Sequence, residues 1–234
     1  MNQQATRNKL LAALPTEELE LIQQHATHVR LNGCEVLYDA GQPIQHVYFV
    51  TDGIVSILSL VSASTGVETV TIGREGMVGM VAFHGETQAP ERTLVQVPGA
   101  AYRLDVATFR DLLPRLPGLN KLLNRFAVVM FSLASQNSAC NRKHSIEARC
   151  ARWLLTVADR LDTTTMELTH DFVAQMLGVR RASVTESLGS FEKRGFVQTG
   201  RGRITVTDHT GLEGIACGCY GIIRGAVGRM VASS

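Results

Sequence analysis

Apolar positions along the chain fall into three successive patterns, and each predicts a different kind of element. Between residues 6 and 28, leucine and isoleucine recur at helical spacing, which predicts short helices. From residue 29 to 104, short β-branched and aromatic runs alternate with glycines, which is typical of the many short strands of a sandwich or barrel. Asp52-Gly53 lies between two such runs and predicts a hairpin turn. From residue 105 onwards the spacing is helical again.

The longest helical pattern starts beyond Pro117, where spacings of three and four residues alternate over about four heptads. We expect this stripe to form a coiled-coil dimer interface made of Leu119, Leu123, Phe126, Met130, Leu133, Asn137 and Cys140. Asn137 supports this interpretation, because a polar residue at an inward position commonly fixes register and two-chain pairing. A helix packed on its own domain is the alternative, but such a helix rarely keeps so long a regular seam.

The stretch from Thr169 to Leu188 predicts two short helices joined by a tight turn. Thr169 is a good N-cap for the first helix, and its hydroxyl can also contact a phosphate. Gly178 permits the left-handed conformation that ends this helix. On the second helix, spacings of four and three predict a buried face made of Val184, Leu188 and Phe191. Such a helix pair is how many proteins enter the major groove of DNA.

The outward side of the second helix carries the side chains that we expect to contact DNA. Those near its N-terminus are Arg180, Arg181, Ser183 and Glu186. Arginine there can hold the O6 and N7 atoms of guanine. Two predicted strands follow around a glycine-rich turn, and they place Arg201 and Arg203 at a hairpin tip suited to backbone phosphates. An ordinary helical hairpin with a solvated basic face is the alternative.

Composition and charge agree with a globular regulator that binds nucleic acid. Apolar residues make up 45% of the chain and charged residues 19%, which suits a folded protein. Residues 1–140 hold 10 Lys or Arg against 12 Asp or Glu, whereas residues 141–234 hold 13 against 9, so the second part is basic. No apolar run is long enough for a membrane span, and residues 1–9 lack a signal core. Five scattered cysteines indicate the reducing cytoplasm.

Taken together, residues 10–210 resemble the Crp/Fnr family of bacterial transcription regulators, most specifically over residues 168–195. The resemblance implies an α+β fold: a cyclic-nucleotide-binding-type β-roll with N-terminal helices at 1–110, a dimerisation helix at 111–144, and a winged helix-turn-helix domain at 145–234. It further implies a homodimer that senses a signal in the β-roll and binds a palindromic double-stranded DNA operator. RNA polymerase is a further partner to consider, and a membrane is not expected.

Two departures from the family pattern concern what the protein recognises. On the second helix, Arg181 matches the family, whereas Ala182 and Glu186 stand where a glutamate and a second arginine are typical, so we expect a different operator. In the cyclic-nucleotide cassette, Arg92 matches the arginine that holds the cyclic phosphate, but Met80 replaces the glutamate that holds the ribose. A thioether cannot replace that carboxylate as an acceptor, so we expect either an unknown effector other than cyclic AMP or no effector. The effector-pocket residues carried over are Gly79, Met80, Arg92, Thr93 and Ser135.

Three alternatives remain open beside this hypothesis. The first is a regulator that does respond to a cyclic nucleotide. The second is a regulatory protein-binding module without DNA binding. The third is an enzyme, which is disfavoured because no His-x-His pair, Gly-x-Ser-x-Gly motif or phosphate loop occurs. Without a nucleotide to hold, Arg92 is expected to pair with Glu91 or Glu86.

The cofactor is unknown from sequence, and residue types exclude some candidates. An iron–sulfur cluster is not expected, because only Cys34 lies in the N-terminal region. Candidate haem ligands by type alone are His25, His28, His46 and His84. Cys217-Gly-Cys219 lacks the usual zinc spacing and has no second pair, so no metal site is expected there. For Cys140 a packed free thiol is favoured over a regulatory disulfide.

Overall fold

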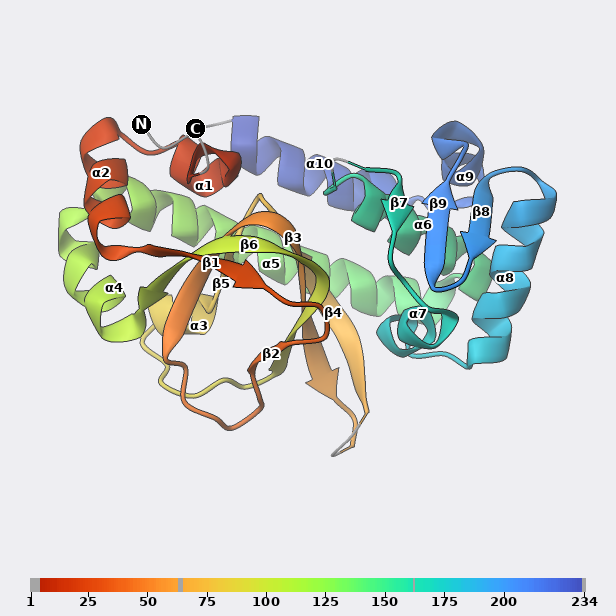
Figure 1. Cartoon of the computed structure of the whole chain (residues 1–234), viewed down its shortest axis with the longest axis horizontal. Helices are drawn as coiled ribbons and strands as arrows, with labels where there is room; N and C mark the ends of the chain where they lie inside the picture. Colours follow the sequence, from red (N-terminus) through yellow and green to blue (C-terminus); the bar gives the residue numbers. More distant parts are fainter. Residues whose placement is uncertain (1–4, 63–64, 162, 233–234) are drawn as a thin grey trace. The chain divides into compact units, whose positions relative to one another are not determined.

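A computed structural model describes residues 5–62, 65–161 and 163–232, and residues 1–4 of the polar start lie outside it. The chain divides into two compact units (Figure 1). The first consists of Met1–Ile57, Val70–Ser132 and Ala226–Ser234, and the second of Leu58–Thr69 and Leu133–Gly225. Among the described residues, no helix combines the length and apolar character needed to cross a membrane.

The first unit holds most of a curled sheet of six strands, of which residues 58–60 and 66–69 belong to the second unit (Figure 1). The strands are β1 (Thr27–Leu31), β2 (Val36–Tyr38), β3 (His46–Leu60), β4 (Gly66–Ile72), β5 (Met77–Val78) and β6 (Arg92–Asp105). Their order is β1-β6-β3-β4, with β2 paired to β6 and β5 paired to β3. The helices are η1 (Ala5–Arg7), α1 (Lys9–Ala12), α2 (Thr16–His25), α3 (Met80–Phe83), α4 (Val106–Leu112) and η2 (Leu113–Arg115). The architecture confirms the expected cyclic-nucleotide-binding-type β domain.

Asp52-Gly53 does not form the hairpin that the sequence predicts, because both residues lie inside β3, which is one continuous strand from His46 to Leu60. Gly53 instead adopts φ 78° within the strand. A Cβ atom there would lie 2.5 Å from the Val97 carbonyl oxygen of β6, and one on Gly99 would lie 2.1 Å from the Asp52 carbonyl oxygen. The two glycines therefore allow β3 and β6 to approach closely where their backbones bend.

Helix α5 (Pro117–Lys143) is the long helix expected from the heptad pattern. Its N-terminus is fixed by Glu18 of α2, whose buried carboxylate accepts hydrogen bonds from the Gly118 and Leu119 N–H groups at 2.8 and 2.9 Å. These bonds satisfy two of the free donors at the helix start, where negative charge is also favourable. The predicted dimerisation helix is thereby anchored to the first unit of its own chain.

The apolar stripe of α5 is occupied by contacts inside the single chain, which corrects its assignment as a dimer seam. Leu119, Leu123, Phe126, Leu133 and Cys140 are each at most 5% exposed, and Met130 and Asn137 are half-buried. Phe126 packs against Gly76, and the Asn137 amide donates to the Thr69 carbonyl at 2.8 Å. The alternating spacing thus identified a buried stripe, but the same chain buries it.

The second unit contains the helix pair, a small sheet and two terminal helices (Figure 1). Its helices are α6 (Ile146–Ala158), α7 (His170–Leu177), α8 (Arg181–Lys193), α9 (His209–Ile215) and most of α10 (Cys219–Ala232). The sheet has the order β7-β9-β8, formed by Thr165–Met166, Arg203–Val206 and Val197–Gly200. The predicted two-stranded hairpin therefore gains a third strand, and the segment after Leu212 is largely helical.

Candidate DNA-recognition surface and sensor cavity

The helix pair of the second unit has the geometry that its sequence predicts. The Thr169 hydroxyl accepts a hydrogen bond from the Phe172 N–H at 3.1 Å and caps α7. Gly178 ends α7 in the left-handed conformation, with φ 62° and ψ 41°. Helix α8 then begins at Arg181, and its fully buried face consists of Val184, Leu188 and Phe191. One face of α8 is thus fixed by packing while the other remains open to solvent.

The open face of α8 exposes the side chains that we expect to contact DNA. Arg180, Arg181 and Glu186 are exposed, and Ser183 is half-buried. Arg181 Nε lies 3.5 Å from Asp171 Oδ1 of α7, and the two side chains are 66% and 68% exposed. An exposed ion pair of this kind contributes only about 0–1 kcal/mol. Arg181 can therefore exchange Asp171 for a group on a bound molecule at little cost.

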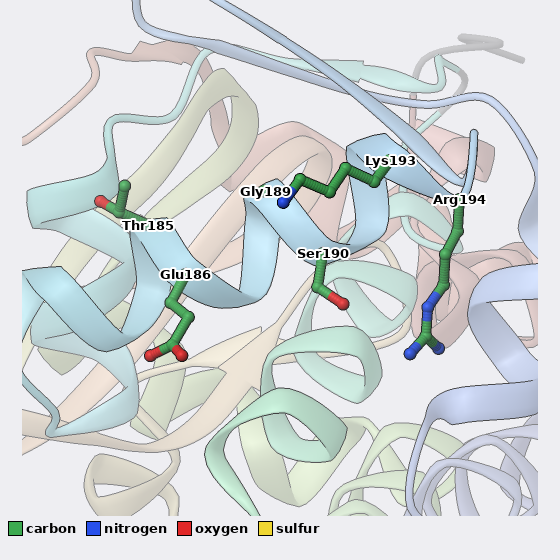
Figure 2. A pocket seen from close by; sticks show the side chains of 6 residues that line it. All are labelled: Thr185, Glu186, Gly189, Ser190, Lys193 and Arg194. Carbon is green, nitrogen blue, oxygen red and sulfur yellow. The ribbon is translucent and has the colours of Figure 1, made fainter.

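A shallow hollow of about 410 Å³ continues along the same face of α8. It is lined by Thr185, Glu186, Gly189, Ser190, Lys193 and Arg194 (Figure 2). Gly189 leaves open space at its centre, since an added Cβ would meet no atom within 4 Å. Figure 2 shows Lys193 lying back along the helix toward Gly189. The recognition face is therefore polar, uneven and accessible over most of the helix.

The hairpin after α8 forms an exposed basic tip. Gly200 of β8 is paired with Arg203 of β9, so Arg201 and Gly202 make a two-residue turn in which Gly202 has φ 69°. Arg201 is exposed, and Arg203 Nη2 lies 3.8 Å from the exposed carboxylate of Glu167. Both arginines are free to reorient, which suits contact with mobile phosphate oxygens.

A small cavity in the first unit lies among the residues expected to hold an effector. It is lined by Tyr38, Ile44, Gly79, Met80, Thr93 and Met130, together with neighbouring residues. Its volume is about 70 Å³, whereas pockets for small molecules typically measure about 300–1,000 Å³. The Tyr38 hydroxyl donates to the His46 carbonyl, and burial raises the pKa of Tyr38 well above its ordinary value. The cavity wall is therefore mostly apolar, with Glu91 as the charged residue in its lining.

Arg92, the residue that matches the family's phosphate-binding arginine, is held by a carboxylate. Its Nε and Nη2 atoms donate to the two carboxylate oxygens of Asp39, each at 3.0 Å. These bonds lower the pKa of the Asp39 carboxyl and raise that of Arg92. Asp39 is thus a partner that the sequence analysis, which considered Glu91 and Glu86, did not anticipate. Ser135, the remaining expected pocket residue, belongs to the second unit and is exposed on α5.

Comparison with family models identifies both units. Residues 28–115 match the cyclic nucleotide-binding domain, and residues 148–215 match the Crp-like helix-turn-helix domain. The chain belongs to the Crp/Fnr family of transcription regulators. This is a family of DNA-binding regulators that are not enzymes and are typically dimeric. The helix-turn-helix of this Crp/Fnr protein therefore implies DNA binding.

Solved structures share the fold of this Crp/Fnr chain. FixK2 from Bradyrhizobium japonicum is 16% identical, with a TM-score of 0.69 over 82% of this chain and 98% of FixK2. TTHB099, a CRP-family transcriptional regulator from Thermus thermophilus, is 19% identical, with a TM-score of 0.66 over 80% and 96% of the chains. The c-di-GMP responsive regulator CLP of Xanthomonas campestris is 13% identical, with a TM-score of 0.65 over 82% and 99%. The search of curated proteins gives no match.

The structure also brings together four residues that the sequence analysis treated separately. The side chains of Cys140, His144, Cys217 and Cys219 meet in the second unit, and we call them the Cys/His cluster. Cys140 had been expected at a dimer seam, and Cys217-Gly-Cys219 had been set aside as a metal site. The available signal was the spacing of Cys140 and His144, which places both on one side of a helix.

Proposed function

We propose that this Crp/Fnr protein is a homodimeric regulator that inserts α8 of each chain into the major groove of a palindromic DNA operator. The observation that carries the proposal is the exposed N-terminal face of α8, which stands opposite a fully buried one. Arg181 would hold a guanine, and Glu186 would accept from a cytosine amino group. Arg180 and Ser183 would contact the same stretch, while Ala182 offers only an apolar contact such as a thymine methyl.

Phosphate contacts would fix the position of α8 on the duplex. Thr169 lies at the N-terminus of α7, where free N–H groups and the helix dipole favour an anion. Arg201 and Arg203 form the exposed tip of the hairpin and would reach the backbone beside the groove. These contacts supply affinity without sequence preference, so the choice of operator would depend on α8.

The dimer would form through a different stripe of α5 from the one expected. Asn124, Val128, Phe131 and Ser135 recur at spacings of four, three and four, and Val128 and Phe131 are 66% and 75% exposed. Large apolar side chains exposed in such a row are typical of an association surface. A symmetric pairing of two α5 helices would bury both and present two recognition helices to the two halves of a palindrome.

The signal that controls binding would not be cyclic AMP. A cavity of about 70 Å³ walled by Met80 and Met130 supports this proposal, as does the engagement of Arg92 by Asp39. A bound cyclic nucleotide would need space, a carboxylate for the ribose and a free guanidinium for the phosphate. The effector itself stays unassigned. Action in the cytoplasm and contact with RNA polymerase also remain parts of the proposal.

Selection of bound sequences from random DNA, using the full-length protein, tests the proposal. We expect an inverted repeat whose half-site centres lie one helical turn apart, about 10–10.5 base pairs. The logarithm of the binding constant for the selected operator should fall linearly with the logarithm of salt concentration, because phosphate contacts release counterions. A failure to enrich any sequence, or an affinity that salt does not change, would refute DNA recognition and favour a protein-binding module.

A further inference from the structure

The Cys/His cluster joins two segments that are distant in sequence. Cys140 and His144 lie one turn apart at the C-terminal end of α5, while Cys217 and Cys219 lie around the start of α10. The four ligand atoms, three Sγ and one imidazole nitrogen, all lie within 4.8 Å of one another. Cys140 Sγ is 3.4 Å from Cys217 Sγ, and Cys219 Sγ is 3.6 Å from His144 Nδ1.

We propose that this cluster binds one divalent cation, preferentially Zn²⁺, through three thiolates and one imidazole. In a tetrahedral zinc site with Zn–S bonds of about 2.3 Å and a Zn–N bond of about 2.0–2.1 Å, two sulfur atoms stand about 3.8 Å apart, and a sulfur and a nitrogen about 3.6 Å. The separations of 3.4 and 3.6 Å in the cluster are close to these two lengths. A Cys₃His set is a known type of structural zinc site, and soft thiolates disfavour Mg²⁺ and Ca²⁺. With four protein ligands the site is closed to substrate, so its role is structural or regulatory.

The surroundings of the cluster have the features of a built site. Cys140, Cys217 and Cys219 are buried, at 0%, 7% and 4% exposure, whereas His144 is exposed and leaves a route for the ion. The Gln136 amide donates to Cys219 Sγ at 3.0 Å. Hydrogen bonds of this kind orient ligating groups and tune a metal centre from outside its ligand set.

Charge balance gives a second and independent argument. Three thiolates and one divalent cation leave a single net negative charge, which needs a cation beside it in a buried place. Arg149 and Arg152 of α6 are buried, at 7% and 4% exposure. Arg149 interacts electrostatically with Cys140 and Cys217, and Arg152 interacts with Cys217. Within the described part of the chain, the Nε atoms of both arginines are buried without a hydrogen-bond partner. A metal–thiolate centre would place one net negative charge beside these two buried guanidinium groups.

The position of the cluster indicates what the ion would do. Cys140 and His144 precede residue 148, and Cys217 and Cys219 follow residue 215, so all four lie outside both matched family models. The ion would fasten the start of α10 to the end of α5, two residues before α6 begins at Ile146. It would thereby fix the point at which the DNA-binding helices leave α5. A disulfide between Cys140 and Cys217 would not account for Cys219 and His144.

The test starts from full-length protein purified without a metal-affinity step or chelator. Elemental analysis should find one equivalent of zinc per chain. After removal of zinc, titration with Co²⁺ should give the intense visible bands of tetrahedral cobalt and a thiolate-to-cobalt charge-transfer band, and added Zn²⁺ should abolish both. Chelation should also lower the melting temperature, because the ion binds the folded chain and not the unfolded one.

Variants locate the ion in the cluster. The double variant Cys219→Ser/His144→Ala removes two ligands, one of them exposed, and should lose the zinc and the cobalt spectrum while circular dichroism shows an intact fold. Gln136→Leu should lower the metal affinity about 10-fold, the effect expected of an outer hydrogen bond. Cys34→Ser, which alters an exposed thiol far along the chain, is the matched control and should keep full metal content.

Three results would overturn the proposal. The first is purified wild-type protein that contains no zinc and gives no tetrahedral cobalt spectrum. The second is metal content and cobalt spectra that are the same in the double variant as in the wild type, which would place the ion elsewhere. The third is thiol trapping and mass analysis that find Cys140 disulfide-bonded to Cys217 in protein kept from air. None of these measurements depends on DNA binding, so they stand apart from the test of the proposed function.

Discussion

The recognition helix α8 and the sensor cavity differ in how closely their residues match those expected for the Crp/Fnr family. Helix α8 exposes Arg180, Arg181 and Glu186 on one face and buries the other, as a DNA-contacting helix requires. The cavity is lined by Met80, where the family resemblance leads us to expect a carboxylate, and its volume of about 70 Å³ lies below that of typical small-molecule pockets. The comparison teaches that, in this chain, the exposed face of α8 agrees with the family expectation while the cavity lining departs from it.

The largest expected effect comes from removing the packing that holds the recognition helix α8 in place. Phe191 lies on the buried face of α8, and Phe191→Ala should lower the free energy of unfolding by about 3–5 kcal/mol, because it leaves a cavity in a small core. DNA affinity should fall with the loss of a fixed α8. Urea denaturation and a DNA-binding titration measure the two effects.

Lys193→Ala, at an exposed position on the same helix, is the control for Phe191→Ala. It should change the free energy of unfolding by less than about 0.5 kcal/mol. If the two variants unfold at the same urea concentration, the packing of α8 is not what holds the recognition face in place.

The next effect concerns the pairing that would present two recognition helices together. Phe131→Ala removes an aromatic side chain that is 75% exposed on α5. At a dimer interface such an anchor contributes at least about 2 kcal/mol, so the dimer dissociation constant should rise about 30-fold or more. Sedimentation equilibrium measures it.

Asn137→Leu distinguishes the two stripes of α5. The Asn137 amide is bonded to Thr69 of its own chain, so this variant should leave the dimer dissociation constant unchanged. If Asn137→Leu raises the dimer dissociation constant and Phe131→Ala leaves it unchanged, the dimer interface is the stripe from Leu119 to Cys140 that the sequence predicts.

A smaller effect would sharpen what α8 recognises. Arg181→Ala should cost about 1–3 kcal/mol of discrimination between the selected operator and a variant with its guanine replaced, while the dimer persists. Arg201→Ala, at the hairpin tip, should instead weaken binding to all sequences alike and reduce the salt slope by about one. Competition titrations at several salt concentrations separate the two. Equal losses of discrimination in both variants would remove Arg181 from the role of base contact.

The helix pair could be predicted because its signals are local. Thr169, Gly178 and the spacing of Val184, Leu188 and Phe191 each act within one helix turn or one helix face, and the structure reproduces all of them. Local patterns also predicted strands in the sensor domain, but they predicted short ones, whereas β3 has 15 residues and β6 has 14. The strand ends were missed because Asp52-Gly53 serves as well for a bend inside a long strand as for a turn.

The features that sequence could not supply depend on which distant surfaces meet. The stripe from Leu119 to Cys140 indicates burial, but its spacing is the same whether a second chain or the same chain covers it. The Cys/His cluster brings Cys140 to 3.4 Å from Cys217, a residue 77 positions later, and no spacing rule covers such a pair. Asp39 meets Arg92 in the same way, because it follows β2, which pairs with β6.

The last prediction concerns the sensor cavity, and it is that cyclic AMP has no effect on stability. Cyclic AMP at millimolar concentration should leave the melting temperature unchanged, whereas a ligand at 100 times its dissociation constant stabilises by about 2.7 kcal/mol. Met80→Glu, which restores the missing carboxylate, should not create binding either, because the cavity stays small and Asp39 still holds Arg92. A rise in melting temperature for the wild type would show that the cavity opens around the nucleotide. A rise for Met80→Glu alone would mean that the carboxylate, and not the space, had been the missing requirement.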